Sequence, residues 1–130
     1  LKNIDEVDFS LKLKSVYKAI NITSNKINKD KKDLIGFVGA PWTILVYMIN
    51  KISPKKKLRE DFFKDEFLIN QLLSIIDKFL KFHIKNQVEA GATIIQIFDS
   101  WAGLLSEKNI PEYIYSPTLN LVFLLLVKNT

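Results

Sequence analysis

The hydrophobic residues of the first third of the chain follow two different spacings. Over residues 9–27 they recur every three or four positions, which predicts an amphipathic helix. Residues 1–8 are polar and acidic and are expected to form a connection, and the charged stretch 28–33 is expected to turn. Residues 34–38 are instead an unbroken apolar run that ends in Gly-Ala-Pro at 39–41, which predicts a buried strand.

The middle of the chain predicts two further helices. Residues 42–49 are expected to be helical, with Pro41 just ahead of them, where a missing N–H costs little. A lysine-rich loop over 50–57 leads into a long helical pattern over 58–90, either as one helix or as two with a break near 64–66.

A second β-rich run and a last helix follow. Gly91 is expected to end the long helix, and residues 93–98 are expected to form the second strand. Ser116 is expected to cap a final apolar helix, with Pro117 at its first position.

This order of elements indicates an α/β fold built from parallel βαβ units, because strands buried on both faces and separated by long helices are typical of parallel sheets. Two strands cannot close such a sheet, and a (β/α)8 TIM barrel takes about 250 residues. The chain has 130 residues. It is therefore expected to be a single incomplete domain over 1–130, about half of a TIM barrel, with the N-terminal and C-terminal parts of the barrel missing.

Composition excludes several classes of protein. The chain has no cysteine, which excludes a disulfide scaffold, a Cys-ligated metal site and a cysteine nucleophile. Its net charge is +5, but Arg59 is the only arginine, so we expect no nucleic-acid partner. No apolar run reaches the roughly 20 residues of a transmembrane helix, and no signal peptide is recognisable. A cytoplasmic protein without membrane contact is expected.

Two strand ends carry residue types that suit a ligand. In parallel α/β folds, ligands bind beyond the carboxyl ends of the strands. Gly39 and Tyr47 follow the first predicted strand, and Asp99 and Ser100 follow the second. Gly39 and Gly103 are expected where the backbone turns tightly or meets a ligand.

These two segments together resemble the uroporphyrinogen decarboxylase family. Residues 36–48 carry that family's Gly-Phe-small-Gly-x-Pro-aromatic-Thr-x-x-x-Tyr-Met pattern, and residues 97–103 carry its Ile-Phe-Asp-Ser-x-Ala-Gly pattern. The two patterns occur in the family's order and are joined by a long helical segment. The resemblance covers about residues 9–120, with small departures at Ile44 and Asn50.

The resemblance implies a (β/α)8 barrel, usually a homodimer, that needs no metal or organic cofactor. Such an enzyme removes CO₂ from the four acetate side chains of uroporphyrinogen III to give coproporphyrinogen III in haem synthesis. By position, Tyr47 and Ser100 match the family's active-site tyrosine and serine and would hydrogen-bond substrate carboxylates, with Asp99 and Gly39 at the same substrate site. A pyrrole protonated at its α-carbon would accept the electrons, so the protein must exclude water and place a proton donor.

The family's other site groups lie outside this segment. Its substrate-binding arginines and its pyrrole-binding aspartate lie upstream, and a functional histidine lies downstream. Arg59 and His83 match none of these positions, so no such role is assigned to them. The chain alone is therefore expected to be inactive.

Several residues have plain structural alternatives. By spacing alone Tyr47 would pack in the core, and Ser100 or Asp99 could cap a strand end or the following turn. Phe37 and Trp42 are expected in the core. His83 is expected to be a packing or surface residue, and the lysines at 55–57 a solvated loop.

Two other functions remain open. The chain could belong to a corrinoid-dependent methyltransferase of the same superfamily, although no cysteine is present for that enzyme's zinc site. Alternatively, it could be a non-enzymatic half-barrel module that associates through exposed apolar edges.

Overall fold

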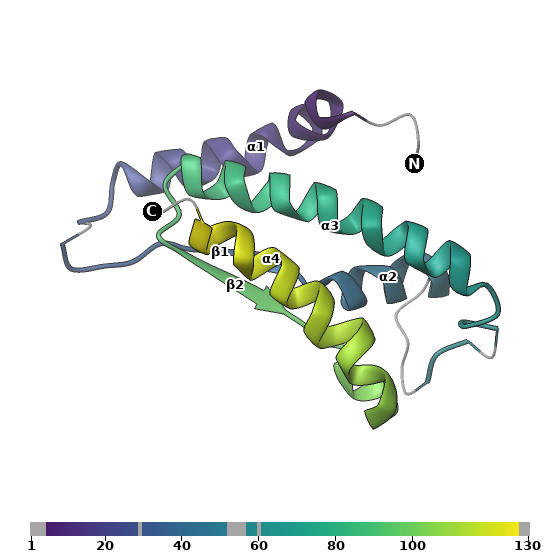
Figure 1. The fold of residues 1–130 in the computed structure, drawn as a ribbon. Helices are drawn as coiled ribbons and strands as arrows, with labels where there is room; N and C mark the ends of the chain where they lie inside the picture. Colours follow the sequence, from purple (N-terminus) through teal and green to yellow (C-terminus); the bar gives the residue numbers. More distant parts are fainter. Residues whose placement is uncertain (1–4, 29, 52–56, 60, 128–130) are drawn as a thin grey trace. The chain divides into compact units, whose positions relative to one another are not determined.

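The computed structural model describes residues 5–28, 30–51, 57–59 and 61–127 (Figure 1). The main elements, in chain order, are α1 (Glu6–Ser24), β1 (Ile35–Gly39), α2 (Pro41–Asn50), α3 (Glu66–Glu89), β2 (Ile94–Phe98) and α4 (Ser116–Val127). Three short helical segments, η1 (Ala102–Leu104), η2 (Glu107–Asn109) and η3 (Pro111–Tyr115), lie between β2 and α4.

The two strands pair in one two-stranded sheet. At their starts Thr93 N–H donates to the Leu34 carbonyl, and at their ends Ala40 N–H donates to the Phe98 carbonyl. The strands therefore run parallel, as the sequence predicts. The chain divides into two compact units, the first made of Leu1–Val38 and Lys81–Gln96 and the second of Gly39–Leu80 and Ile97–Thr130.

Helix α1 begins earlier than the hydrophobic spacing suggests. The Asp5 side chain accepts a hydrogen bond from the Asp8 backbone N–H at 2.8 Å, which caps the helix. Glu6 and Asp8 lie in the first turn, where negative charge interacts favourably with the helix dipole. The prediction of a connection is therefore wrong for residues 6–8, and residues 1–4 lie outside the described part.

In the first unit, α1 packs against the last turns of α3. The Phe9 ring meets the Phe82 ring edge-on, with 6.4 Å between centroids, and Tyr17 is hydrogen-bonded to His83. Gly91 ends α3 with a φ of +113°. A Cβ atom there would collide with the buried Ser24 side chain, so glycine is required by both conformation and space. The predicted stop at Gly91 is confirmed.

Each strand is covered on one face only. Gly36 and Val38 are buried, whereas Phe37 is 65% exposed and Phe98 is 51% exposed. The Gln87 amide of α3 bonds both the N–H and the carbonyl of Phe37, each at 3.1 Å. A Cβ atom on Gly36 would lie 2.6 Å from Gln87 Oε1, so α3 lies against the face opposite the Phe37 ring. The predictions of strands buried on both faces and of Phe37 in the core are therefore wrong for the described structure.

The core of the second unit forms around Trp42. This side chain is fully buried, as predicted, and its ring contacts three other rings, those of Phe62, Phe63 and Tyr113. Helix α2 covers the predicted range, and its Leu45 and Val46 side chains are buried with Trp42. The aromatic contacts join α2 to the turn before α3 and to η3.

Helix α3 starts at Glu66, after a turn at residues 61–64, and not at residue 58. Asp65 accepts a hydrogen bond from the Leu68 N–H at 2.9 Å and so caps the helix. Neither predicted form is observed: the described residues at 57–59 and 61–65 form no helix, and a single helix follows from Glu66 to Glu89. Within the predicted loop, residues 52–56 lie outside the described part.

The last helical stretch begins at Pro111 and passes through η3 into α4. Ser116 has helical dihedrals, φ −59° and ψ −51°, so it lies inside the helical stretch and the predicted cap is wrong. Pro111 takes the N-terminal position that Pro117 was expected to hold. Within the described residues, no helix combines the length and apolar character needed to cross a bilayer.

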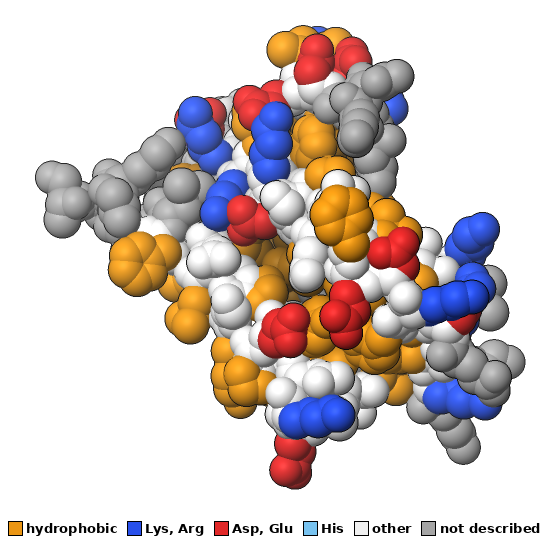
Figure 2. Space-filling model, turned by 45° about the vertical axis from the view of Figure 1, so that its right-hand side comes forward, with side chains coloured by type: hydrophobic (Ala, Val, Ile, Leu, Met, Phe, Trp, Pro, Cys, Tyr) orange, Lys and Arg blue, Asp and Glu red, His pale blue; other side chains and the backbone are white. Residues whose placement is uncertain are grey.

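Hydrophobic side chains also reach the surface of the molecule. Figure 2 shows them between the charged side chains on the face drawn. Exposed examples occur on both strands and on α1 and α4: Val7, Leu11, Ile35, Phe37, Ile94, Phe98, Leu119 and Phe123. Exposed apolar surface of this kind, where it is contiguous, often marks a face that packs against another segment or chain.

Candidate functional site

The four residues predicted to form the site, Gly39, Tyr47, Asp99 and Ser100, all lie in the second unit. The hydrogen bond from Ala40 N–H to the Phe98 carbonyl, at 2.7 Å, places the two strand ends next to each other. The two sequence motifs, far apart along the chain, therefore meet at one edge of the sheet.

Thr43 links the two motifs directly. Its hydroxyl Oγ1 donates to Asp99 Oδ1 at 2.7 Å and accepts from the Trp101 backbone N–H at 3.4 Å. A second link lies beside it, since Trp42 Nε1 donates to the Trp101 carbonyl at 2.9 Å. Sequence reasoning singled out Asp99 and Ser100 but missed Thr43, although its place inside the first motif was the signal that could have identified it.

Asp99 is half-buried, and only one of its carboxylate oxygens has a partner. Burial raises the pKa of Asp99 above its ordinary value, while the hydrogen bonds with Thr43 act in the opposite direction. Asp99 Oδ2 is buried without a hydrogen-bond partner among the described residues. The Asp99 carbonyl accepts weakly from Ala102 N–H at 3.4 Å, so the backbone and not the carboxylate supports the following turn.

Tyr47 and Ser100, one in each of the two motifs, are both exposed. Tyr47 is 47% exposed, and its ring meets the Trp101 ring edge-on at 6.0 Å between centroids. The alternative of a core tyrosine is therefore wrong. Ser100 is exposed, and its hydroxyl forms no hydrogen bond with the described part of the chain. Both hydroxyl groups are thus accessible to a ligand.

The two glycines predicted near the site have ordinary backbone angles, since Gly91 is the glycine with positive φ in the described chain. A Cβ atom on Gly39 would lie 3.2 Å from the Ile44 side chain, which is a tight contact. Around Gly103 nothing lies within 4 Å of such an atom. Gly39 therefore allows α2 to pack closely behind the strand end, whereas Gly103 has no comparable constraint.

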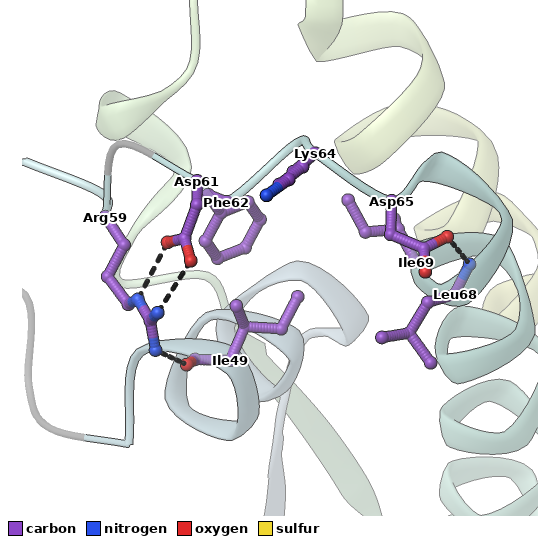
Figure 3. A pocket seen from close by; sticks show the side chains of 8 residues that line it. All are labelled: Ile49, Arg59, Asp61, Phe62, Lys64, Asp65, Leu68 and Ile69. Carbon is purple, nitrogen blue, oxygen red and sulfur yellow. Dashed lines mark hydrogen bonds and ion pairs between the residues drawn. The ribbon is translucent and has the colours of Figure 1, made fainter.

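A separate hollow of about 420 Å³ lies in the same unit (Figure 3). Arg59 is one of its lining residues. The guanidinium forms an ion pair with the Asp61 carboxylate at 2.7 Å and donates a hydrogen bond to the Ile49 carbonyl at 3.4 Å. The guanidinium lowers the pKa of the Asp61 carboxyl. None of the four predicted site residues is among its lining residues, which are Ile49, Arg59, Asp61, Phe62, Lys64, Asp65, Leu68 and Ile69.

The remaining candidates have structural roles or lie outside the described residues. His83 is half-buried between Tyr17 and Gln87 in the first unit, and burial lowers the pKa of its ring, so its prediction as a packing residue is confirmed. Lys57 is exposed, and residues 55 and 56 are not described. Within the described ranges, no three His, Asp or Glu side chains come together as they would to hold a metal ion.

Comparison with known proteins gives a consistent result. The family model for uroporphyrinogen decarboxylase (URO-D) matches residues 1–123. The chain is 43% identical over 114 residues to a uroporphyrinogen decarboxylase of Orientia tsutsugamushi (strain Boryong) and 39% identical over 119 residues to one of Campylobacter lari. A Campylobacter jejuni (strain RM1221) enzyme of the same name is 35% identical over 123 residues.

These alignments cover most of this chain but little of its relatives. They include 85%, 89% and 93% of the chain for the Orientia, C. lari and C. jejuni proteins, against 33%, 35% and 36% of those proteins. The chain therefore spans about a third of the length of the curated relatives it matches.

Proposed function

The chain belongs to the uroporphyrinogen decarboxylase family, and we propose that it supplies part of the barrel and part of the substrate site of such an enzyme. The reaction is the removal of CO₂ from the four acetate side chains of uroporphyrinogen III, which gives coproporphyrinogen III. In this proposal residues 1–130 form one incomplete domain of a (β/α)8 barrel, an internal segment whose N-terminal and C-terminal parts are missing. By the relatives' length it is nearer a third than a half of the barrel.

One observation carries the proposal. The two family motifs are joined by the hydrogen bond between Thr43 and Asp99, while Tyr47 and Ser100 next to them stay exposed. A phenol and an aliphatic hydroxyl are both hydrogen-bond donors, so they suit a substrate rich in carboxylates. We assign substrate contact to Tyr47 and Ser100, and Asp99 and Gly39 belong to the same proposed site.

The chemistry fits a site that binds and orients the substrate. Protonation of a pyrrole α-carbon creates a cation that accepts the electron pair of the breaking carbon–CO₂ bond. A proton then takes the place of the lost CO₂, and the proton that was added to the α-carbon leaves, which restores the pyrrole. Tyr47 and Ser100 would hold neighbouring carboxylates in a fixed geometry during these steps. The cationic and proton-transferring groups would come from parts of the barrel outside this chain, so the chain alone should be inactive.

The exposed strand residues support the same proposal. Ile35, Phe37 and Ile94 present apolar surface that further strands of a barrel would cover. The same exposure also favours the alternative of a non-enzymatic module that associates through these faces. The homodimer implied by the family resemblance and the cytoplasmic location expected from the composition belong to the proposal as well.

A chimera tests the proposed function. Residues 1–123 would replace the matching third of the Orientia relative, and coproporphyrinogen formation would be followed under anaerobic conditions. We expect an active chimera and no turnover by the isolated chain. A chimera that folds, judged by circular dichroism and thermal unfolding against the relative, but forms no coproporphyrinogen would overturn the proposal and favour the interaction module.

A further inference from the structure

The Thr43 hydroxyl uses both of its hydrogen-bonding functions at the junction of the two motifs. Its single proton is donated to Asp99 Oδ1 at 2.7 Å, and its oxygen accepts from Trp101 N–H at 3.4 Å. The side chain is only 6% exposed, so water has little access to compete for these bonds. Valine has the same shape but can make neither bond, whereas serine can make both.

These bonds hold the chain on both sides of Ser100. Asp99, before it, is bound through its carboxylate, and Trp101, after it, is bound through its N–H. The Trp101 carbonyl is also held, by Trp42 Nε1 at 2.9 Å. The backbone of Ser100 is therefore anchored at both neighbours, although its own hydroxyl is exposed and has no partner in the described chain.

Asp99 is poorly suited to bind the substrate itself. An ionised carboxylate only accepts hydrogen bonds, and it would repel a substrate carboxylate at close range. Its Oδ1 is already committed to Thr43. Burial raises the pKa of this carboxyl, which favours its neutral form relative to an exposed aspartate. Asp99 is therefore better explained as a residue that supports the site than as one that contacts the substrate.

We propose that Thr43 and Asp99 are positioning residues, a pair that we term the Thr43–Asp99 latch, which holds the Ser100 hydroxyl in place for a substrate carboxylate. This inference rests on the proposed function. It assigns the direct contact to Ser100 and gives Thr43 and Asp99 an effect only through that residue.

The latch predicts a specific pattern of kinetics in the chimera. Thr43→Val should lower kcat/KM by about 10-fold, the effect of losing one hydrogen bond to a charged group, mainly through a higher KM. Thr43→Ser should restore values close to those of the parent chimera. Thr23→Val is a control, because among the described residues the Thr23 hydroxyl bonds only the Ala19 carbonyl of its own helix, at 2.9 Å.

A double-mutant cycle separates positioning from general destabilisation. In a Ser100→Ala background, Thr43→Val should cause no further loss of kcat/KM, because the group that the latch positions is already gone. Additive losses, or a Thr43→Val chimera as active as its parent, would overturn the latch. If Thr43→Val does not fold, Asp99→Ala removes the same bond from the other side, and its loss should likewise vanish in the Ser100→Ala background.

The same measurements distinguish the two proposals. A folded parent chimera without activity overturns the proposed function and the latch with it. An active parent whose Thr43 and Asp99 variants behave additively with Ser100→Ala overturns the latch alone. Both proposals are supported if Thr43→Val lowers kcat/KM, Thr43→Ser restores it, and Thr43→Val causes no further loss in the Ser100→Ala background.

Discussion

Trp42 donates its indole N–H to the backbone carbonyl of Trp101 at 2.9 Å, across 59 positions of sequence. The Trp101 indole N–H, in contrast, is buried without a hydrogen-bond partner among the described residues. The first turn of α2 is thus tied to the loop after β2 by one tryptophan, while the other tryptophan contacts Tyr47 with its ring. The two tryptophans should respond differently to the same substitution.

Trp42→Phe should destabilise the chain by about 2 kcal/mol or more. It leaves the Trp101 carbonyl without this donor and opens a cavity among the rings of Phe62, Phe63 and Tyr113. Trp101→Phe is the matched control and should cost less than about 1 kcal/mol, since its N–H has no partner to lose. Urea unfolding followed by circular dichroism measures both, and equal losses would contradict the assigned role of Trp42.

Tyr47→Phe should lower the activity of the chimera by about 10-fold or more. It removes one oriented hydrogen bond to an ionised group, worth about 1.5–3 kcal/mol, and keeps the ring that meets Trp101. Tyr115→Phe is the control, because Tyr115 is also an exposed tyrosine but lies outside the predicted site. An unaltered rate of coproporphyrinogen formation in Tyr47→Phe would remove Tyr47 from the substrate site.

Gly91→Ala should destabilise the fold by more than about 1 kcal/mol. Its φ of +113° is unfavourable for any residue with a Cβ atom, and that atom would collide with Ser24. Gly103→Ala offers a control, since no atom lies within 4 Å of a Cβ at that position. Thermal unfolding of the two variants should show a large decrease in Tm for Gly91→Ala only.

His83 lies in a hydrogen-bonded chain that favours its neutral form. The Gln87 amide is held in place by Phe37, donating to its carbonyl and accepting from its N–H, so its second amide hydrogen points to His83 Nε2 at 3.1 Å. His83 Nε2 is then the acceptor, and Nδ1–H donates to Tyr17 Oη at 2.9 Å. Protonation of His83 would place a new N–H donor on Nε2 against the N–H donor of the Gln87 amide. Burial also lowers the pKa of the ring.

The free energy of unfolding should therefore fall as the pH drops below about 6.5, the ordinary pKa of histidine. Because the pKa is lowered in the folded state, the unfolded chain binds the proton more readily, and the stability present above that pH is lost on acidification. His83 is the only histidine. Urea unfolding at pH 7.5 and 5.5 should show this loss in the wild-type chain and not in His83→Gln; the same loss in both would exclude His83 as its source.

Local sequence rules predicted the elements well where the deciding interaction is itself local. The stop at Gly91 depends on one backbone angle, and the helix after Pro41 depends on a residue that suits the first turn. The start of α1 is also a local matter, since it depends on the Asp5 cap, which hydrophobic spacing does not register. The parallel pairing of the strands was also predicted, because long helical segments separate strands that are parallel.

Burial could not be predicted in the same way. Phe37 and Trp42 are both large, apolar and close together in the sequence, yet Trp42 is fully buried and Phe37 is 65% exposed. A hydrophobic pattern identifies the residues that gain from being covered, but whether they are covered depends on which other segments pack there. In the described structure α3 lies against the face of β1 opposite Phe37, where a Cβ atom on Gly36 would lie 2.6 Å from Gln87 Oε1.

By itself, the sequence determined the parallel α/β class, the family, and the two motifs that contain Tyr47 and Ser100, because periodicity and motif spacing are properties of neighbouring residues. Only the tertiary structure decided that Thr43 bonds Asp99, 56 positions away, and that Trp42 bonds Trp101. A side-chain hydrogen bond needs its donor and acceptor within about 3 Å. Between residues so distant in the chain, only the folded backbone can bring the two atoms that close.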